Sequence, residues 1–416
     1  MSLDRSFDIK NIVCSYFFDL KDTINLYNLN KEHQNYIMII NLYCVELKYI
    51  SRLNQQIIEQ NKYKYVEKLN AFDNNKIKNV NHMKTLKILN CCFDCAIDQN
   101  GILELNLTEL YSDDNSKIKN VNYMKKTLKI LNCSHNSGID QYGISELNLI
   151  ELNTNGNKKI KNVNHMKETL KKLNCCFDSE IDQNGIAELN LIELHVIKNK
   201  KMANVNHMKK TLKILMCSDN ESRIDQNGIS ALNLIELYAQ NNKNITSVNH
   251  MKKTLKILDC SENSGVDQNG ISELNLIKLF VQGNKKIVNV NHMKKTLKIL
   301  NCGDYYFGGC GIDQVGISEL NLSELYAHNN KKIVNVNHMK TALKKLECGF
   351  DCGIDQNGIS ELNLIELEAG GNKRIKNVNH MKKTLKILSC DFDSGIDQNG
   401  ISDGEKYSFT PSHGFF

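Results

Sequence analysis

Apolar residues recur along this chain in a short frame that repeats throughout most of its length. In residues 320–343, Leu322, Leu325, Ala327 and Ile333 occupy positions 1, 4, 6 and 12 of one copy. The next copy begins at Leu343, 21 residues after Leu322. Positions 4 and 6 are two residues apart, so on a strand their side chains point to one side, while those at positions 3, 5 and 7 point to the other. The pattern therefore predicts one short, half-buried strand in each copy.

Two kinds of copy alternate along the chain. The cysteine unit reads L-K-[IK]-L-x-C-x-x-[ND]-x-x-[IV]-D-Q-x-G-I, and the histidine unit reads L-I-E-L-x-[AVST]-x-x-N-x-x-I-x-x-V-N-H-M. Cysteine units begin at Leu86, Leu128, Leu170, Leu212, Leu255, Leu297, Leu343 and Leu385, and histidine units at Val66, Leu107, Leu149, Leu191, Leu234, Leu276, Leu322 and Leu364. One short strand cannot bury its apolar side alone, so sixteen such units predict a stacked coil with a shared core.

This frame resembles the leucine-rich repeat family, whose units read L-x-x-L-x-L-x-x-[NC]-x-L over about 20–29 residues. The resemblance implies an α/β leucine-rich repeat solenoid: a curved parallel sheet of about 16 units of 21 residues in two alternating types. We expect the solenoid over residues 61–401 and a C-terminal tail over 402–416. In histidine units, Ile333, Val336 and Met339 continue at three-residue spacing, which suits a tight helical turn on the outer side.

The resemblance also gives a role to the polar residue at position 9, which in this family forms an inward ladder that bonds to the turn backbone. Buried turn amides need such partners. The residues at this position are Asn74, Asn115, Asn136, Asn157, Asn199, Asn220, Asn242, Asn263, Asn284, Asn330 and Asn372, with Asp94, Asp178, Asp351 and Asp393 in the same place.

Residues 1–60 lie before the repeats and predict a small helical segment. The stretch F-D-I-K-N-I-V-x-x-Y-F-x-x-L-K-D-T-I-N-L looks like a degenerate F-box, the module that docks onto a Skp-type adaptor of cullin ubiquitin ligases. The adaptor-docking residues that this resemblance implies are Phe7, Ile9, Ile12, Val13, Phe17 and Leu20. The alternative is a helical cap that covers the first unit. Residues 36–58 suit either a helix or one worn repeat.

Composition adds a source and a location to these expectations. The chain has one Pro and no Trp and is rich in Asn, Lys and Ile, and with its double repeat it is similar to leucine-rich repeat proteins of giant amoeba-infecting viruses, which are mimivirus-like. Its N-terminus lacks the apolar core of a signal peptide, and no run of about 20 apolar residues predicts a membrane span. We therefore expect an intracellular, cytoplasmic protein, in a host cell if the source is viral.

The repeated cysteines and histidines do not predict chemistry. Cysteine occupies inward-pointing position 6, and successive copies lie two strands, or about 10 Å, apart, which is too far for a disulfide ladder. The V-N-H-M histidines are equally far apart, beyond the reach of one metal ion. D-Q-N-G has the composition of a turn and not of a calcium loop. We therefore expect no catalytic site, no cofactor and no metal, and a protein that is not an enzyme.

Lysines cluster before the strands of the cysteine units, as at Lys125-Lys126 and Lys252-Lys253. Stacking would align them into a basic stripe that could attract nucleic acid or an acidic partner. The net charge is only +6, however, and Glu occupies position 3 of most histidine units. We expect a solvated stripe and no nucleic-acid partner.

The positions that change between otherwise similar units are the candidates for recognition. Position 5 of the histidine units would point to the concave face, and position 8 of the cysteine units also varies. Their aromatic members and one histidine are Tyr111, His195, Tyr238, Phe280 and Tyr326 at position 5, and Phe93, Phe177, Phe350 and Phe392 at position 8. Exposed aromatic residues commonly anchor protein interfaces, although tyrosine and phenylalanine also simply suit a sheet. We predict that these residues bind a protein partner, with a ubiquitin-ligase substrate receptor as the alternative function.

Overall fold

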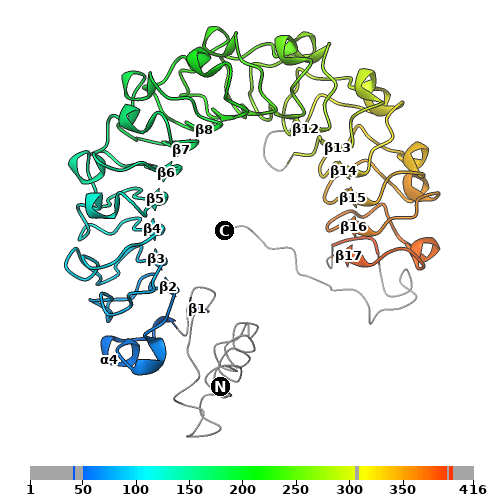
Figure 1. Ribbon diagram of the computed structural model, residues 1–416. Coiled ribbons are helices and arrows are strands. Elements are labelled where there is room, and N and C mark those ends of the chain that lie inside the picture. The colour runs from blue at the N-terminus through cyan, green and yellow to red at the C-terminus, as the bar shows by residue number, and fades with distance from the viewer. Residues whose placement is uncertain (1–40, 43–49, 305–308, 391–392, 397–416) are drawn as a thin grey trace, which may run out of the picture. The chain divides into compact units, whose positions relative to one another are not determined.

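The computed structural model describes residues 41–42, 50–304, 309–390 and 393–396 (Figure 1). The chain divides into two compact units, residues 1–195 and 196–416. The predicted helical segment, with Phe7, Ile9, Ile12, Val13, Phe17 and Leu20, lies outside the described residues, as do Phe392 and the predicted tail.

The first unit is a parallel sheet in which each strand pairs with the next along the chain. Its strands are β1 (Asn41–Leu42), β2 (Lys68–Asn70), β3 (Ile88–Asn90), β4 (Glu109–Tyr111), β5 (Ile130–Asn132), β6 (Glu151–Asn153), β7 (Lys172–Asn174) and β8 (Glu193–His195). Its helices are α4 (Gln55–Ile58) and the 3-10 helices η1 (Asn61–Tyr63), η2 (Asn122–Met124), η3 (Tyr142–Ile144), η4 (Asn164–Met166) and η5 (Asn184–Ile186).

The second unit repeats this arrangement. Its strands are β9 (Ile214–Met216), β10 (Glu236–Tyr238), β11 (Ile257–Asp259), β12 (Lys278–Phe280), β13 (Ile299–Asn301), β14 (Glu324–Tyr326), β15 (Lys345–Glu347), β16 (Glu366–Glu368) and β17 (Ile387–Ser389). Its 3-10 helices are η6 (Asn206–Met208), η7 (Asn227–Ile229), η8 (Asn249–Met251), η9 (Asn269–Ile271), η10 (Asn291–Met293), η11 (Val315–Ile317), η12 (Asn337–Met339), η13 (Asn357–Ile359) and η14 (Asn379–Met381).

Within each unit the strands lie on the concave side and the 3-10 helices lie on the convex side (Figure 1). The core between them is made by the apolar frame of the repeat: Leu131 at position 4, Cys133 at position 6 and Met124 of the helical turn are all fully buried. The strands span positions 3 to 5, and positions 3 and 5 are half-buried on the side away from this core. The predicted strand in each of the sixteen repeats is thus confirmed, and the predicted helical turn is confirmed in seven of the eight histidine units, the first of which has turns and no 3-10 helix there.

The sheet begins earlier than the repeat frame predicts. Strand β1 pairs with β2 in parallel, and Leu42 lies opposite Leu69. The side-chain amide of Asn74 donates to the carbonyls of Ile50 and Leu53, as the other buried asparagines do to the preceding unit. The described residues 41–42 and 50–58, with α4 at their end, therefore contact the first repeat as one unit contacts the next, while the rest of the segment 36–58 lies outside the described residues.

Candidate functional site

Several polar residues that recur in alternate repeats hold neighbouring repeats together. The glutamine of D-Q-x-G is an example: Gln99 Oε1 accepts from the backbone N–H groups of Lys119 and Asn120, and its Nε2 donates to the Asn120 carbonyl. The same three bonds join the next repeat at Gln141, Gln226, Gln268, Gln314 and Gln356. These glutamines thus form a ladder of side chains along the turns, and their amide groups are engaged in hydrogen bonds to the next repeat.

A second ladder is made by the asparagine at position 9 of the histidine units. Asn115 is buried, and its Nδ2 donates to the carbonyls of Cys91 and Ile97 at 2.9 and 3.1 Å, while its Oδ1 accepts from the Lys117 N–H. Burial without these partners would cost free energy, so the residue type is fixed by the backbone around it.

The prediction that cysteine units contribute to this ladder is wrong. Asn136, Asn220 and Asn263 are exposed, and so are the aspartates at the same position, Asp94, Asp178, Asp351 and Asp393. In these units a small residue one place later, such as Ser137 or Ser264, turns inward and is fully buried. The asparagine of a histidine unit, such as Asn115, already donates hydrogen bonds to the carbonyls of the adjacent cysteine unit. The cysteine units therefore need no inward carboxamide of their own.

The histidine of V-N-H-M has the same kind of structural role. His165 Nε2 lies 3.1 Å from the carbonyl of Ile144 in the preceding unit, and burial lowers the pKa of the ring, which favours its neutral form. Tyr123, which replaces this histidine in one unit, donates its hydroxyl to the carbonyl of Ile102 in the same way. The replacement preserves the bond, so the position is selected by the backbone and not by a metal. The part of the chain that the structure describes contains no group of three candidate metal ligands.

The thirteen described cysteines are all buried, and no disulfide joins them within the part of the chain that the structure describes. Burial raises the pKa of the Cys95 thiol to about 11 and that of Cys217 to about 12. Thiols with such values stay protonated at neutral pH and are poor nucleophiles. The position-6 cysteines therefore act as small apolar core residues.

The strand face opposite the core is where the repeats differ. Tyr111, His195, Tyr238, Phe280 and Tyr326 are each the last residue of a strand and are half-buried on this face, as the sequence predicts. The three tyrosines share one geometry: each hydroxyl donates to the glutamate two residues earlier, at 2.9 Å from Tyr111 to Glu109, 2.9 Å from Tyr238 to Glu236 and 2.7 Å from Tyr326 to Glu324. His195 lies 2.6 Å from Glu193 in the same arrangement.

One of these tyrosine–glutamate pairs is next to a lysine that the chain itself supplies. Lys345 Nζ lies 2.8 Å from Glu366, 3.2 Å from Glu347 and 5.3 Å from the centre of the Tyr326 ring. Burial alone would lower the pKa of Lys345, but hydrogen bonds to Glu366 and Glu347 raise it overall, so the ammonium stays charged. This cluster shows that the strand face can hold an ammonium group between carboxylates and an aromatic ring.

A strand in each unit, a 3-10 turn in most units and a buried asparagine in each histidine unit decide the architecture. The fold is a leucine-rich repeat solenoid. No protein-family model matches the sequence, and no curated protein matches it.

Comparison with solved structures finds distant similarities. The solenoid is similar to the Rad7–Elc1 complex of yeast, with 16% identity, a TM-score of 0.40 and coverage of 96% of this chain and 91% of the other. It is also similar to the TLR13–ssRNA13 complex, with 16% identity, a TM-score of 0.46 and coverage of 84% and 60%. A third similarity is to a leucine-rich repeat protein from Bacteroides thetaiotaomicron, with 13% identity, a TM-score of 0.34 and coverage of 99% and 58%. The chain thus spans about 60% of the length of the last two.

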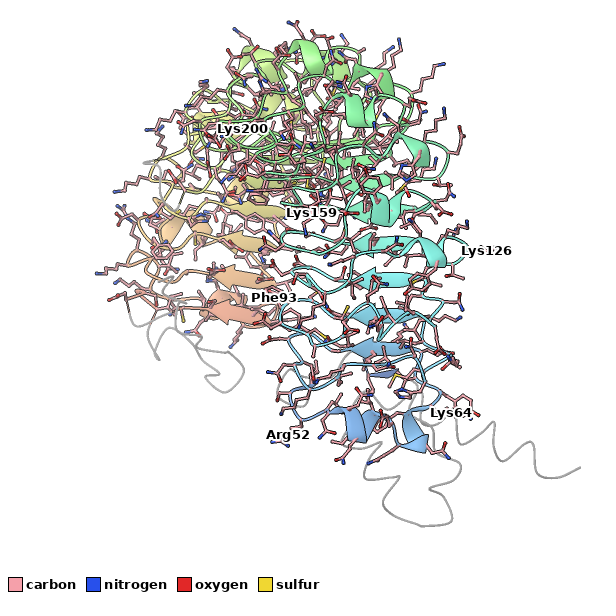
Figure 2. The ribbon with its side chains drawn as sticks, turned by 90° about the vertical axis from the view of Figure 1, so that its left-hand side faces the viewer. Arg52, Lys64, Phe93, Lys126, Lys159 and Lys200 are labelled. Atoms are coloured by element: carbon pink, nitrogen blue, oxygen red, sulfur yellow. The ribbon has the colours of Figure 1, made fainter. Side chains whose placement is uncertain are left out.

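The phenylalanines at position 8 of the solenoid lie beside the strand face and not on it. Phe93, Phe177 and Phe350 follow the strands by three residues and have positive φ angles of 61°, 55° and 57°. Their side chains are 44–45% exposed. Figure 2 shows Phe93 at the edge where the strands end, whereas Lys126 lies at the opposite edge. A bulky residue in the left-handed region costs free energy, and the histidine units often have Gly or Asn there.

The neighbouring repeat neutralises part of the predicted basic stripe. Lys167 pairs with Glu188 at 2.7 Å and Lys340 pairs with Glu361 at 2.6 Å. Equivalent pairs join Lys84 to Glu104, Lys125 to Glu146, Lys252 to Glu273 and Lys294 to Glu319. Such exposed pairs add little stability, but they reduce the positive potential along this edge of the solenoid.

Sequence reasoning did not find the Lys345 cluster or the glutamine ladder. A signal for the cluster is present in the sequence: position 3 of the cysteine units is Ile in most copies but Lys172 and Lys345 in two, between glutamates of the flanking strands. Lys172 lies 3.8 Å from Glu151 and 3.3 Å from Glu193. Residues at the same position of adjacent strands face each other, so the repeat alignment alone could have paired them.

Proposed function

We propose that this leucine-rich repeat solenoid is a non-enzymatic scaffold that binds a protein partner through its strand face. The observation that carries the proposal is the contrast between the two sets of residues described above. The glutamines and buried asparagines of the turns form hydrogen bonds to the neighbouring repeats. The last residue of each strand instead changes from copy to copy, and it is aromatic in four of the eight histidine units, at Tyr111, Tyr238, Phe280 and Tyr326.

The chemistry of this face supports recognition of a folded or extended polypeptide. Tyrosine gives a large contact area at a low cost in conformational entropy and offers a hydroxyl for hydrogen bonding, which is why it is enriched in interfaces. The hydroxyl of Tyr238 is oriented by Glu236 before any partner arrives, so less side-chain freedom is lost on binding. Phe93, Phe177 and Phe350 would extend the contact at the edge where the strands end.

A triple variant in the second unit tests the proposal. Replacing Tyr238, Phe280 and Tyr326 by alanine should leave the circular dichroism spectrum of the solenoid unchanged, because these side chains face away from the core. The variant should lose the partners that the wild-type chain recovers in affinity capture with mass spectrometry. As a matched control, Tyr142→Ala removes an 82% exposed tyrosine from the convex side and should retain them. Equal recovery by all three proteins would contradict the proposal.

A second candidate function rests on the N-terminal sequence alone. Residues 7–31 resemble an F-box, and as such they would dock a Skp-type adaptor while the repeats select a substrate. A full-length variant with Ile12, Phe17 and Leu20 replaced by alanine should then lose the adaptor and a cullin but keep the partners bound by the strand face. If neither an adaptor nor a cullin is recovered with the wild-type chain, the segment is a cap. An intracellular location and a viral source stay predictions from the sequence.

A further inference from the structure

The strand face of the second unit contains two sites built on the same plan, and only one of them holds a lysine. In the first, Tyr326 and Glu324 of β14 lie beside Lys345 and Glu347 of β15. In the second, Tyr238 and Glu236 of β10 lie beside Ile257 and Asp259 of β11. The parallel register makes the two sets equivalent residue by residue: Tyr238 corresponds to Tyr326, Asp259 to Glu347, and Ile257 to Lys345.

The first site shows what this arrangement holds. The Lys345 ammonium lies between two carboxylates and near the face of the Tyr326 ring. At the second site the tyrosine, its hydrogen-bonded glutamate and the next carboxylate are all present, but the chain supplies isoleucine where the lysine would be. Glu236 makes no ion pair with any residue that the structure describes, and the same is true of Asp259.

Desolvation acts in the same direction on both sites. Burial raises the pKa of Asp259, as burial and the neighbouring Glu368 raise the pKa of Glu347. The Ser261 N–H donates to Asp259 Oδ1 at 3.0 Å and offsets part of this cost, and a cation that arrives from outside would offset more of it. Phe280, opposite Asp259 on β12, adds a second ring to the site.

The third strand is where the two sites differ. Opposite Lys345 on β16 is Glu366, whereas opposite Ile257 on β12 is Lys278. Lys278 makes no ion pair with any described residue, so it does not neutralise the two carboxylates. Its charge would weaken the binding of another cation without abolishing it, because the carboxylates outnumber it two to one.

We propose that the site formed by Glu236, Tyr238 and Asp259 takes a lysine or arginine side chain of the protein partner, in the manner in which the equivalent residues hold Lys345. This inference rests on the proposed function, because it assigns a chemistry to the partner of the same strand face. A carboxylate-lined site of this kind disfavours acidic peptides and nucleic acids.

The experiment measures binding of short fluorescein-labelled peptides of alternating serine and lysine to the full chain by fluorescence anisotropy. Peptides with glutamine or glutamate in place of lysine are the probes for non-specific binding. The lysine peptide should bind, and the glutamate peptide should not. Equal binding of all three peptides would overturn the inference.

Two substitutions in opposite directions locate the site. Ile257→Lys gives the site its own ammonium and should weaken binding of the lysine peptide by about tenfold. This is the loss expected from one cation–π contact and its ion pairs. Lys278→Glu restores the carboxylate found at Glu366 and should strengthen binding by a similar factor. Val315→Lys is the matched control: it adds the same charge at a 68% exposed position on the convex side and should change binding by less than about twofold.

The outcomes separate this inference from the proposed function. If Ile257→Lys and Val315→Lys bind the lysine peptide equally well, the inference is wrong, even where the triple alanine variant has lost its natural partner and the proposed function stands. If the triple alanine variant retains its natural partner, the proposed function fails and the partner chemistry assigned here fails with it. Weaker binding of the lysine peptide by Ile257→Lys, together with stronger binding by Lys278→Glu, supports the inference.

Discussion

The turn region of the solenoid and its strand face use polar residues in opposite ways. In the turns, Gln99 and Asn115 recur in nearly identical surroundings and bond to the backbone of the next or the preceding repeat. On the strand face, Tyr238 and Tyr326 occupy equivalent positions, but their neighbours differ. In the turns, the recurring glutamines and the buried asparagines of the histidine units thus hold the coil together, whereas the strand-face residues that change between copies are the ones that we propose recognise a partner.

The largest effect is expected from the buried asparagine ladder. Asn242 is fully buried, and its Nδ2 donates to the carbonyls of Cys217 and Ile224. Asn242→Ala leaves both carbonyls and the Asn244 N–H without this partner and should lower the free energy of unfolding by about 2–4 kcal/mol. Urea denaturation followed by circular dichroism measures the change.

The control is the same substitution at the same position of a cysteine unit. Asn263 is exposed, so Asn263→Ala should change the free energy of unfolding by no more than about 0.5 kcal/mol. Similar losses in the two variants would contradict the distinction between the unit types.

A pH dependence should come from a buried histidine in the turn after β14. His328 is 3% exposed, and burial lowers its pKa from 6.5 to about 4, against an opposing effect of Asp304. Because the unfolded chain binds the proton more readily, the stability that neutral His328 provides is complete above pH 6.5 and is lost as the pH falls toward 4. The loss should amount to about 2–3 kcal/mol.

The check is a comparison with His328→Gln over the same pH range. Its urea midpoint should fall less between pH 7 and pH 4 than that of the wild-type chain, because the glutamine side chain does not titrate. Parallel pH profiles of the two proteins would exclude His328 as the titrating group.

A smaller effect is expected from the glutamine ladder. Gln268 makes three bonds to the next repeat but lies nearer to solvent than Asn242, so water can replace it in part. Gln268→Ala should cost about 1–2 kcal/mol in the same denaturation assay. Gln268→Glu serves as a comparison, since it retains the acceptor for the Val288 and Asn289 amides but loses the donor; it should fall between the wild type and the alanine variant.

The smallest effect is expected at the exposed lysine–glutamate pairs. Lys340 and Glu361 are more than half exposed, so Glu361→Gln should leave the melting midpoint unchanged within the error of the measurement. A clear drop in the melting midpoint of Glu361→Gln, present at both low and high salt, would mean that these ion pairs stabilise the fold as Asn242 does.

The repeat frame was sufficient to predict the fold because the apolar positions impose it. Leu131 and Cys133 point inward for the same geometric reason in every copy. The frame also located Tyr111, Tyr238 and Tyr326 on the strand face. It could not predict which asparagines turn inward, since Asn136 and Asn157 occupy the same position of different units and only the packing around Ser137 distinguishes them.

The repeat alignment predicts that Lys345 lies opposite Glu366, but it does not predict the contacts of Lys345 with Glu347 and the Tyr326 ring. Those contacts depend on side-chain directions. The left-handed turn at Phe93 depends on how the chain leaves the strand. The repeat frame specifies neither of these features.

The most direct test of the account compares partner recovery by two triple variants from the same repeats of the second unit. One replaces Tyr238, Phe280 and Tyr326 by alanine on the strand face, and the other replaces Asn242, Asn284 and Asn330 by alanine in the turns. We predict that the strand-face variant remains folded by circular dichroism and captures no partner, whereas the turn variant is unfolded or strongly destabilised. A folded strand-face variant that captures its partner as well as the wild-type chain does would contradict the account.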